Sequence, residues 1–131
     1  MAFSPRLVYL AVLVLASHVM LSNAAVRVSR LRATNLPGDP IGHPDPYVKV
    51  WCDSTFGGMT EFQQNNANPI WTAEFNFPNC AAKDILKLEV WDKDTHYDDL
   101  LETCYAHVQS GTHANECTVG KGSLRYSYEL I

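Results

Sequence analysis

The sequence predicts an all-β protein, an eight-stranded antiparallel β-sandwich. Glycine, proline, asparagine and aspartate recur at short intervals, and the stretches between them alternate apolar and polar residues with the period of two that is typical of strands. After the first 24 residues, no stretch shows a convincing helical pattern of apolar residues. Short alternating runs separated by turns, without intervening helices, are typical of an antiparallel sandwich.

The first 24 residues are predicted to be a secretory signal peptide. Arg6 precedes an apolar run over 7–16, and the small residues Ser22 and Ala24 follow. The alternative is a membrane anchor, but that needs about 20 apolar residues, more than this run provides. Cleavage after Ala24 would leave 25–131 as one secreted, extracellular domain.

The first predicted strand, 26–33, alternates apolar and polar residues. The next segment, 35–46, contains four prolines and two glycines, so it can be neither a helix nor a central strand and must be a long loop. A second strand is predicted over 47–52. A third, weaker strand is predicted over 59–63, and the polar turn 64–68 follows it.

The remaining strands follow the same alternation. The stretch 70–77 has four apolar residues on one face, and 85–91 alternates leucine and valine with charged residues. A charged loop over 92–99 comes next. Three further strands complete the prediction, over 100–108, 115–119 and 122–130. Six aromatic residues are expected in the core: Trp51, Trp71, Phe75, Phe77, Trp91 and Tyr126.

Charge is concentrated in two loops. Beyond the signal peptide there are fourteen acidic and nine basic residues, and six of the acids are aspartates of the segments 39–45 and 92–99. Without these six the domain is nearly neutral. Nucleic-acid binding is not expected, because it requires a basic face.

The two aspartate loops predict a calcium site. One loop immediately precedes a predicted strand and the other immediately follows one, so neighbouring strands would bring the carboxylates together. Clustered carboxylates repel and raise one another's pKa values unless a cation lies between them, and calcium takes six to eight oxygen ligands. The loops do not form an EF-hand. The alternative is a solvated acidic turn, as most charged loops are. The candidate ligands are Asp39, Asp45, Asp92, Asp94, Asp98 and Asp99.

The four cysteines, Cys52, Cys80, Cys104 and Cys117, are expected to form disulfides in the oxidising compartment that secretion implies. Their spacing alone leaves all three connectivities open. A zinc site is disfavoured, because no two cysteines show C-x-x-C spacing and no histidine lies at zinc-finger spacing.

Several motifs carry a family resemblance, and they occur in one order along the chain: Leu31-Arg-Ala-Thr-Asn-Leu36, Asp45-Pro-Tyr-Val-Lys-Val50, Asn68-Pro-Ile-Trp71, Leu88-Glu-Val-Trp-Asp-Lys-Asp94 and Asp99-Leu-Leu101. Together they resemble the strand and loop signatures of C2 domains. The closest likeness is to the C-terminal C2 domain of perforins, without the pore-forming MACPF domain. The final segment, 122–130, resembles the opening strand of synaptotagmin-type C2 domains, which implies the permuted, type II topology.

The resemblance implies roles for particular residues. Asp39 and Asp45 would be calcium ligands from the first loop, and Asp92, Asp94 and Asp99 from the third, with Asp98 in support. The segment 94–99 is one residue shorter than the family pattern, which leaves the last ligand open between Asp98 and Asp99. The resemblance also implies a Cys104–Cys117 disulfide, which leaves Cys52 and Cys80 to pair with each other.

By the same resemblance, calcium would allow docking on a phospholipid membrane. Leu36, Ile41 and Tyr97 are the expected membrane-contacting residues, and the alternative for Ile41 and Tyr97 is that they are ordinary exposed loop residues. We expect a monomer in solution that becomes peripheral on membranes when calcium is bound. The resemblance to perforin suggests a role in immune defence or in the regulation of cytolysis.

Two other classes of function compete with this hypothesis. One is a calcium-independent, secreted protein-interaction module. The other is an enzyme, which is not expected, because the sequence has neither G-x-S-x-G nor H-E-x-x-H and no cysteine that would stay free.

Overall fold

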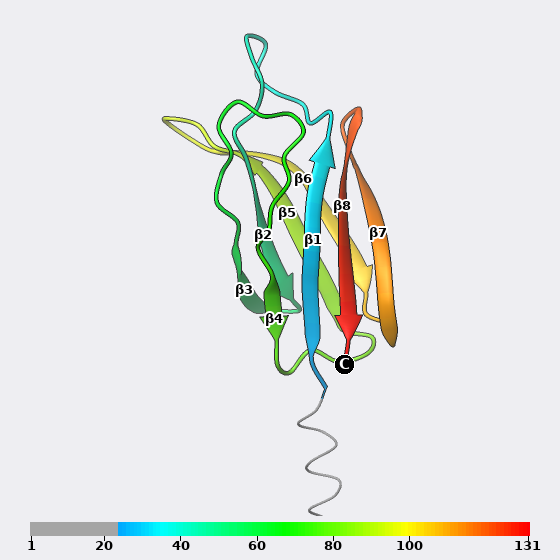
Figure 1. The fold of residues 1–131 in the computed structure, drawn as a ribbon. Helices are drawn as coiled ribbons and strands as arrows, with labels where there is room; N and C mark the ends of the chain where they lie inside the picture. The colour runs from blue at the N-terminus through cyan, green and yellow to red at the C-terminus, as the bar shows by residue number, and fades with distance from the viewer. Residues whose placement is uncertain (1–23) are drawn as a thin grey trace, which may run out of the picture.

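The computed structural model describes residues 24–131 and contains eight strands in two four-stranded antiparallel sheets (Figure 1). The predicted sandwich is therefore confirmed. The proposed signal peptide lies outside the described residues, apart from Ala24. One sheet has the order β4-β1-β8-β7 and the other β3-β2-β5-β6. The strands are β1 (Val26–Thr34), β2 (Pro46–Cys52), β3 (Thr55–Met59), β4 (Phe75–Phe77), β5 (Ile85–Asp92), β6 (Asp99–His107), β7 (Gly111–Val119) and β8 (Gly122–Leu130).

The core fills the space between the two sheets. Alternate residues of β1, β2, β5 and β8 point inward for most of their length, as the sequence pattern requires. Val28, Val48, Leu88 and Leu124 are fully buried. Four of the six aromatic residues expected in the core are buried there: Trp71, Phe75, Phe77 and Tyr126.

The expectation of a core position was wrong for Trp51 and Trp91, which are only partly buried. Their positions on β2 and β5 are out of phase with the buried residues of those strands, so their side chains lie on the outer face of the sheet. Lysine side chains cover them. The Lys87 ammonium lies 4.3 Å from the Trp51 ring centroid, and that of Lys49 lies 4.6 Å from the Trp91 ring centroid.

Three strands differ from the sequence prediction by more than one residue. β3 begins at Thr55 rather than at residue 59, because Asp53 takes a positive φ of 49° and turns the chain back directly after β2. β4 contains only the end of the predicted strand 70–77; upstream of it, Ile70 forms a single bridge to Arg32. β7 begins at Gly111 rather than at residue 115, although its first four residues contain no large apolar side chain.

β8 is the last strand of the chain, but it lies inside its sheet, between β1 and β7. This position is the one expected from the type II topology. The Ile131 amide donates a hydrogen bond to the Ala25 carbonyl over 2.8 Å, so the beginning and the end of the described domain are adjacent. The β1–β2 loop and the β5–β6 loop lie at the opposite end of the sandwich (Figure 1). Within residues 24–131, no helix has the length and apolar character needed to cross a bilayer.

Two disulfides reinforce the sandwich, and their pairs are those that the resemblance implies. Cys52 at the end of β2 is bonded to Cys80, which precedes β5. Cys104 of β6 is bonded to Cys117 of β7, so this bond joins the two sheets. The described residues contain no free cysteine.

Candidate metal centre

The pairing of three strands brings the two aspartate loops together. β2 and β5 are antiparallel neighbours, and Pro46 at the start of β2 lies opposite Asp92 at the end of β5. β5 is also paired with β6, where Asp92 lies opposite Asp99. Asp45, Asp92 and Asp99 therefore lie on adjacent strand ends, although up to 54 positions separate them in the sequence.

Three carboxylates converge at this point. Asp39, Asp92 and Asp99 each place a carboxylate oxygen so that all three atoms lie within 4.8 Å of one another. Asp92 is only 4% exposed, whereas Asp39 and Asp99 are exposed. Burial raises the pKa of Asp92, and the charges of Asp39, Asp45 and Asp99 raise it further. The hydrogen bond that Asp92 accepts from the Asp45 amide acts in the opposite direction.

Asp45 holds the neighbouring loops in place. Its backbone amide donates to Asp92 Oδ1 over 2.8 Å, and its own Oδ1 accepts a hydrogen bond from the Asn65 amide over 2.6 Å. The Asp45 carbonyl also accepts a hydrogen bond from the Lys93 amide over 2.9 Å. The loop between β3 and β4 is thus tied to the site through Asn65, a contribution that the sequence prediction missed.

Asp94 and Asp98 are not in the group of three carboxylates that converge. The Asp94 amide donates to Asp98 Oδ1 over 3.0 Å, and Asp94 Oδ1 accepts a hydrogen bond from the Thr95 amide. The hydroxyl of Tyr47 donates a hydrogen bond to the other oxygen of Asp98. This bond, followed by the one from the Asp94 amide, lowers the pKa of Asp98.

Asp99, and not Asp98, thus joins Asp39 and Asp92 in the cluster. Asp98 instead anchors the β5–β6 loop to Tyr47, whose pKa is raised by burial and by Asp98. No role at the site was predicted for Tyr47 from the sequence. The motif Asp45-Pro-Tyr47 could have indicated this role, because it places a side chain with a polar hydroxyl group directly after one of the aspartate loops.

Two of the three expected membrane-contacting residues are exposed. Ile41 is 97% exposed and Tyr97 is 85% exposed. The expectation for Leu36 was wrong, because Leu36 is only 4% exposed and belongs to the hydrophobic core. Its amide donates to the Ala67 carbonyl over 2.9 Å, which holds the residue against the β3–β4 loop. Phe62 of that loop is also an exposed apolar residue, although no membrane contact was predicted for it from the sequence.

The donor set at the loop end fits a calcium ion. It consists of carboxylate oxygens, which calcium prefers, on loops that suit its flexible coordination. A bound cation would also stabilise the ionised form of the buried Asp92, whose pKa is raised. A second group, formed by Cys52, Cys80 and Asp84, does not fit a metal ion, because both sulfur atoms belong to a disulfide.

Comparison with known proteins relates the chain to one family. A family profile described as "C2 domain" matches residues 24–122. Perforin-1 of Homo sapiens is 36% identical over 111 residues, which cover 80% of this chain and 19% of the relative. Perforin-1 of Mus musculus is 38% identical over 108 residues, with 77% and 19% coverage. The chain therefore spans about a fifth of the length of these curated relatives.

Solved structures agree with this match. A structure described as that of a C2 domain has a TM-score of 0.79 and 44% identity, covering 82% of this chain and 97% of that one. Human GIVD cytosolic phospholipase A2 has a TM-score of 0.73 at 23% identity, covering 84% of this chain and 16% of that one. At that identity, the phospholipase supports the fold alone.

Proposed function

Because the chain belongs to the C2 domain family, we propose that it is a secreted module that binds phospholipid membranes in a calcium-dependent manner. The observation that carries the proposal is the convergence of Asp39, Asp92 and Asp99 within 4.8 Å, with Asp92 buried. C2 domains are binding modules rather than catalytic domains, which is consistent with a role without chemistry.

In this proposal, Asp39, Asp92 and Asp99 hold calcium, and Asp45 and Asp94 offer further carboxylate oxygens on the same loops. Bound calcium would supply positive charge and open coordination positions for lipid phosphate oxygens. Asp98 and Tyr47 would keep the β5–β6 loop in position through their hydrogen bond. Without the cation, the acidic loops would repel an anionic membrane surface.

Ile41 and Tyr97 are the proposed membrane-contacting residues. They lie on the two loops that carry the carboxylates, and both side chains are almost fully exposed. A tyrosine side chain is suited to the membrane interface, because its ring is apolar and its hydroxyl is polar. Phe62 adds a third exposed apolar side chain on the neighbouring loop, where the Lys93 ammonium lies 5.3 Å from its ring centroid.

The relation to perforin supports a wider proposal. The two disulfides are typical of an oxidising compartment, which agrees with secretion and an extracellular location. We propose a role in immune defence or in the regulation of cytolysis, because perforin-1 of two species is 36% and 38% identical to this domain.

Vesicle co-sedimentation tests the proposal. The chain with intact disulfides should sediment with vesicles of phosphatidylserine and phosphatidylcholine in calcium and remain in the supernatant in chelator. The variant Asp92→Asn/Asp99→Asn should lose this calcium-dependent binding. Asp53→Asn is a matched control, since it removes a carboxylate in the β2–β3 turn, and it should bind like the wild type. Equal binding of the wild type in calcium and in chelator would refute calcium dependence.

A second candidate function is calcium-independent protein binding through the outer face of the sheet β3-β2-β5-β6. This face carries Trp51, whose ring centroid lies 5.1 Å from that of the exposed Phe56, together with the exposed Met59 and Tyr105. Aromatic residues and methionine are enriched at protein interfaces. This function predicts no calcium-induced rise in melting temperature, and the same vesicle experiment would show no lipid binding in either condition.

A further inference from the structure

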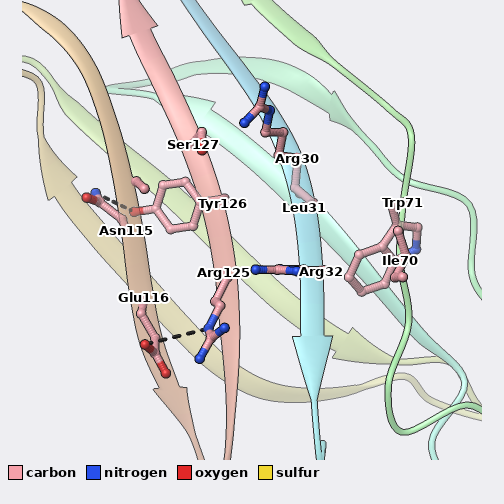
Figure 2. Close-up of a pocket in the computed structure, with 11 residues that line it drawn as sticks. Arg30, Leu31, Arg32, Ile70, Trp71, Asn115, Glu116, Arg125, Tyr126 and Ser127 are labelled. Atoms are coloured by element: carbon pink, nitrogen blue, oxygen red, sulfur yellow. Dashed lines mark hydrogen bonds and ion pairs between the residues drawn. The ribbon is translucent and has the colours of Figure 1, made fainter.

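The outer face of the sheet β4-β1-β8-β7 carries an open hollow of about 640 Å³ (Figure 2). A second hollow of about 600 Å³ adjoins it, and the two share Arg30, Trp71 and Ser127. They lie on the flank of the sandwich, over β1, β8 and β7, and include none of the loop aspartates. The proposed membrane-binding function does not use this region.

The strand register explains why the face is hollow. A row of small side chains crosses three strands, between two rows that contain long charged side chains. The middle row is Ser29, Ser127 and Ala114; one flanking row is Arg32, Arg125 and Glu116; the other is Arg27, Glu129 and Thr112. The result is a trough that runs across the strands, with small and hydroxyl-bearing residues on its floor and arginines on both walls.

A bulge in β1 adds another arginine to the trough. The pairing of β1 with β8 shifts between Ser29 and Arg32, so β1 contains one extra residue there. Arg30 takes a positive φ of 56°, whereas Leu31 beside it is fully buried. The left-handed conformation is unfavourable for a residue other than glycine. The distortion leaves Arg30 exposed at the trough, next to Ser127 (Figure 2).

The trough contains positive charge that acidic side chains neutralise only in part. Arg125 is paired with Glu116 at 3.7 Å and Arg27 with Glu129 at 3.1 Å, and these side chains are about half exposed. Such exposed ion pairs are weak and exchange readily with a ligand. In the described part of the chain, neither Arg30 nor Arg32 forms an ion pair. Their guanidinium groups are thus available to bind sulfate or carboxylate in bidentate geometry.

We propose that this trough binds an acidic saccharide. Sulfate or carboxylate groups of the sugar would bind Arg30, Arg32 and Arg125, and its hydroxyl groups would hydrogen-bond to Ser127. Ile70, which is 70% exposed at the edge of the trough, would pack against the apolar face of a sugar ring. A long, open trough with separated cations fits an extended chain that carries several negative groups.

Calorimetric titration with a size-defined heparin oligosaccharide tests this proposal. The titration uses the disulfide-bonded chain in chelator, so that calcium at the loop end plays no part. Arg30→Gln/Arg32→Gln should weaken binding about tenfold or more, since two charge-assisted contacts are lost. It should also reduce the salt dependence of binding. Lys49→Gln/Lys87→Gln is the matched control, since it removes two positive charges from the other sheet.

Two further measurements distinguish specific contacts within the trough from a general effect of the charge of the protein. Ala114→Trp fills the floor of the trough without changing charge and should also weaken binding, and thermal melting of each variant checks that it is folded. Desulfated oligosaccharide should bind more weakly than the sulfated form. Unchanged affinity in the arginine variant, or an equal loss in the lysine control, would overturn the proposal. So would calcium-free binding to phosphatidylserine vesicles that depends on Arg30 and Arg32 while heparin does not bind.

Discussion

Asp92 links the stability of the fold to the proposed binding of calcium. It is buried beside Asp39, Asp45 and Asp99, and its pKa is raised in the folded chain. The folded chain therefore holds the Asp92 proton more tightly than the unfolded chain does. The contribution of this group to the free energy of unfolding rises as the pH falls and is lost as the pH rises through the folded pKa. Above that range of pH, Asp92 therefore destabilises the calcium-free fold relative to a neutral side chain at the same position.

Replacing Asp92 with asparagine should therefore raise the melting temperature of the calcium-free chain at neutral pH. Asparagine keeps an oxygen that accepts the hydrogen bond from the Asp45 amide. The variant should also lose its response to calcium, whereas calcium at a hundred times its dissociation constant should stabilise the wild type by about 2.7 kcal/mol. Differential scanning calorimetry with and without chelator measures both effects. A variant that melts lower than the wild type in chelator and still responds to calcium would contradict this account.

Tyr47 and Asp98 provide a second test at the level of single residues. The Tyr47 hydroxyl is the main cause of the lowered pKa of Asp98. Because this pKa is lowered in the fold, the stability that Asp98 contributes is lost as the pH falls through it. In Tyr47→Phe, the pKa of Asp98 should rise toward its usual value, as measured by NMR titration of its carboxyl carbon. Tyr105→Phe, which alters an exposed tyrosine, should leave the pKa of Asp98 unchanged.

The sequence predicted the residues of the site better than their separate roles. Aspartates on two loops were sufficient to suggest a cation site. The distinction between Asp98 and Asp99 depends on the register of β5 and β6, and one position of shift reverses the face on which a side chain lies. Leu36 was misassigned because its burial depends on the β3–β4 loop, to which it is bonded through Ala67.

Among the strands, β6 and β7 are joined across the two sheets by a covalent bond between side chains. They are edge strands of different sheets, and the Cys104–Cys117 disulfide joins them. Without that bond, the sheets are held together at this edge mainly by packing. The disulfide between Cys52 and Cys80 acts elsewhere, between the end of β2 and the segment before β5.

Removing the link between the sheets should cost measurable stability. Cys104→Ala/Cys117→Ala should lower the free energy of unfolding by about 3 kcal/mol, as expected for opening a short covalent loop. Urea denaturation measures this change, with mass spectrometry to verify that Cys52 and Cys80 remain bonded. A loss below about 1 kcal/mol would show that packing alone holds β6 and β7 together.

The strands themselves were predictable where apolar residues alternate clearly, as in β1, β5 and β8. Prediction failed for β3 and the first half of β7. β3 contains Gly57 and Gly58, and the first half of β7 has no large apolar residue, so neither shows a hydrophobic pattern. Backbone pairing with β2 and β8 determines these two strands, and pairing is not visible in local sequence.

Across the whole molecule, charge is divided between two regions. Carboxylates gather at the loop end, and arginines gather on the flank of the sheet β4-β1-β8-β7. The loop cluster was visible from the sequence, since it accounts for the net negative charge of the domain. The arginine trough was not, because Arg32 and Arg125 become neighbours only through the pairing of the first strand with the last.

The first and last residues of the described domain are adjacent in space. Ala25 and Ile131 are joined by a backbone hydrogen bond, and β1 and β8 lie side by side. A short linker between these residues would permit circular permutation, with a new break in the β2–β3 turn. Both the old and the new ends would then lie far from the aspartate loops. The ends of the described domain are therefore remote from the candidate metal centre, and a fusion partner joined at either of them would leave that surface accessible.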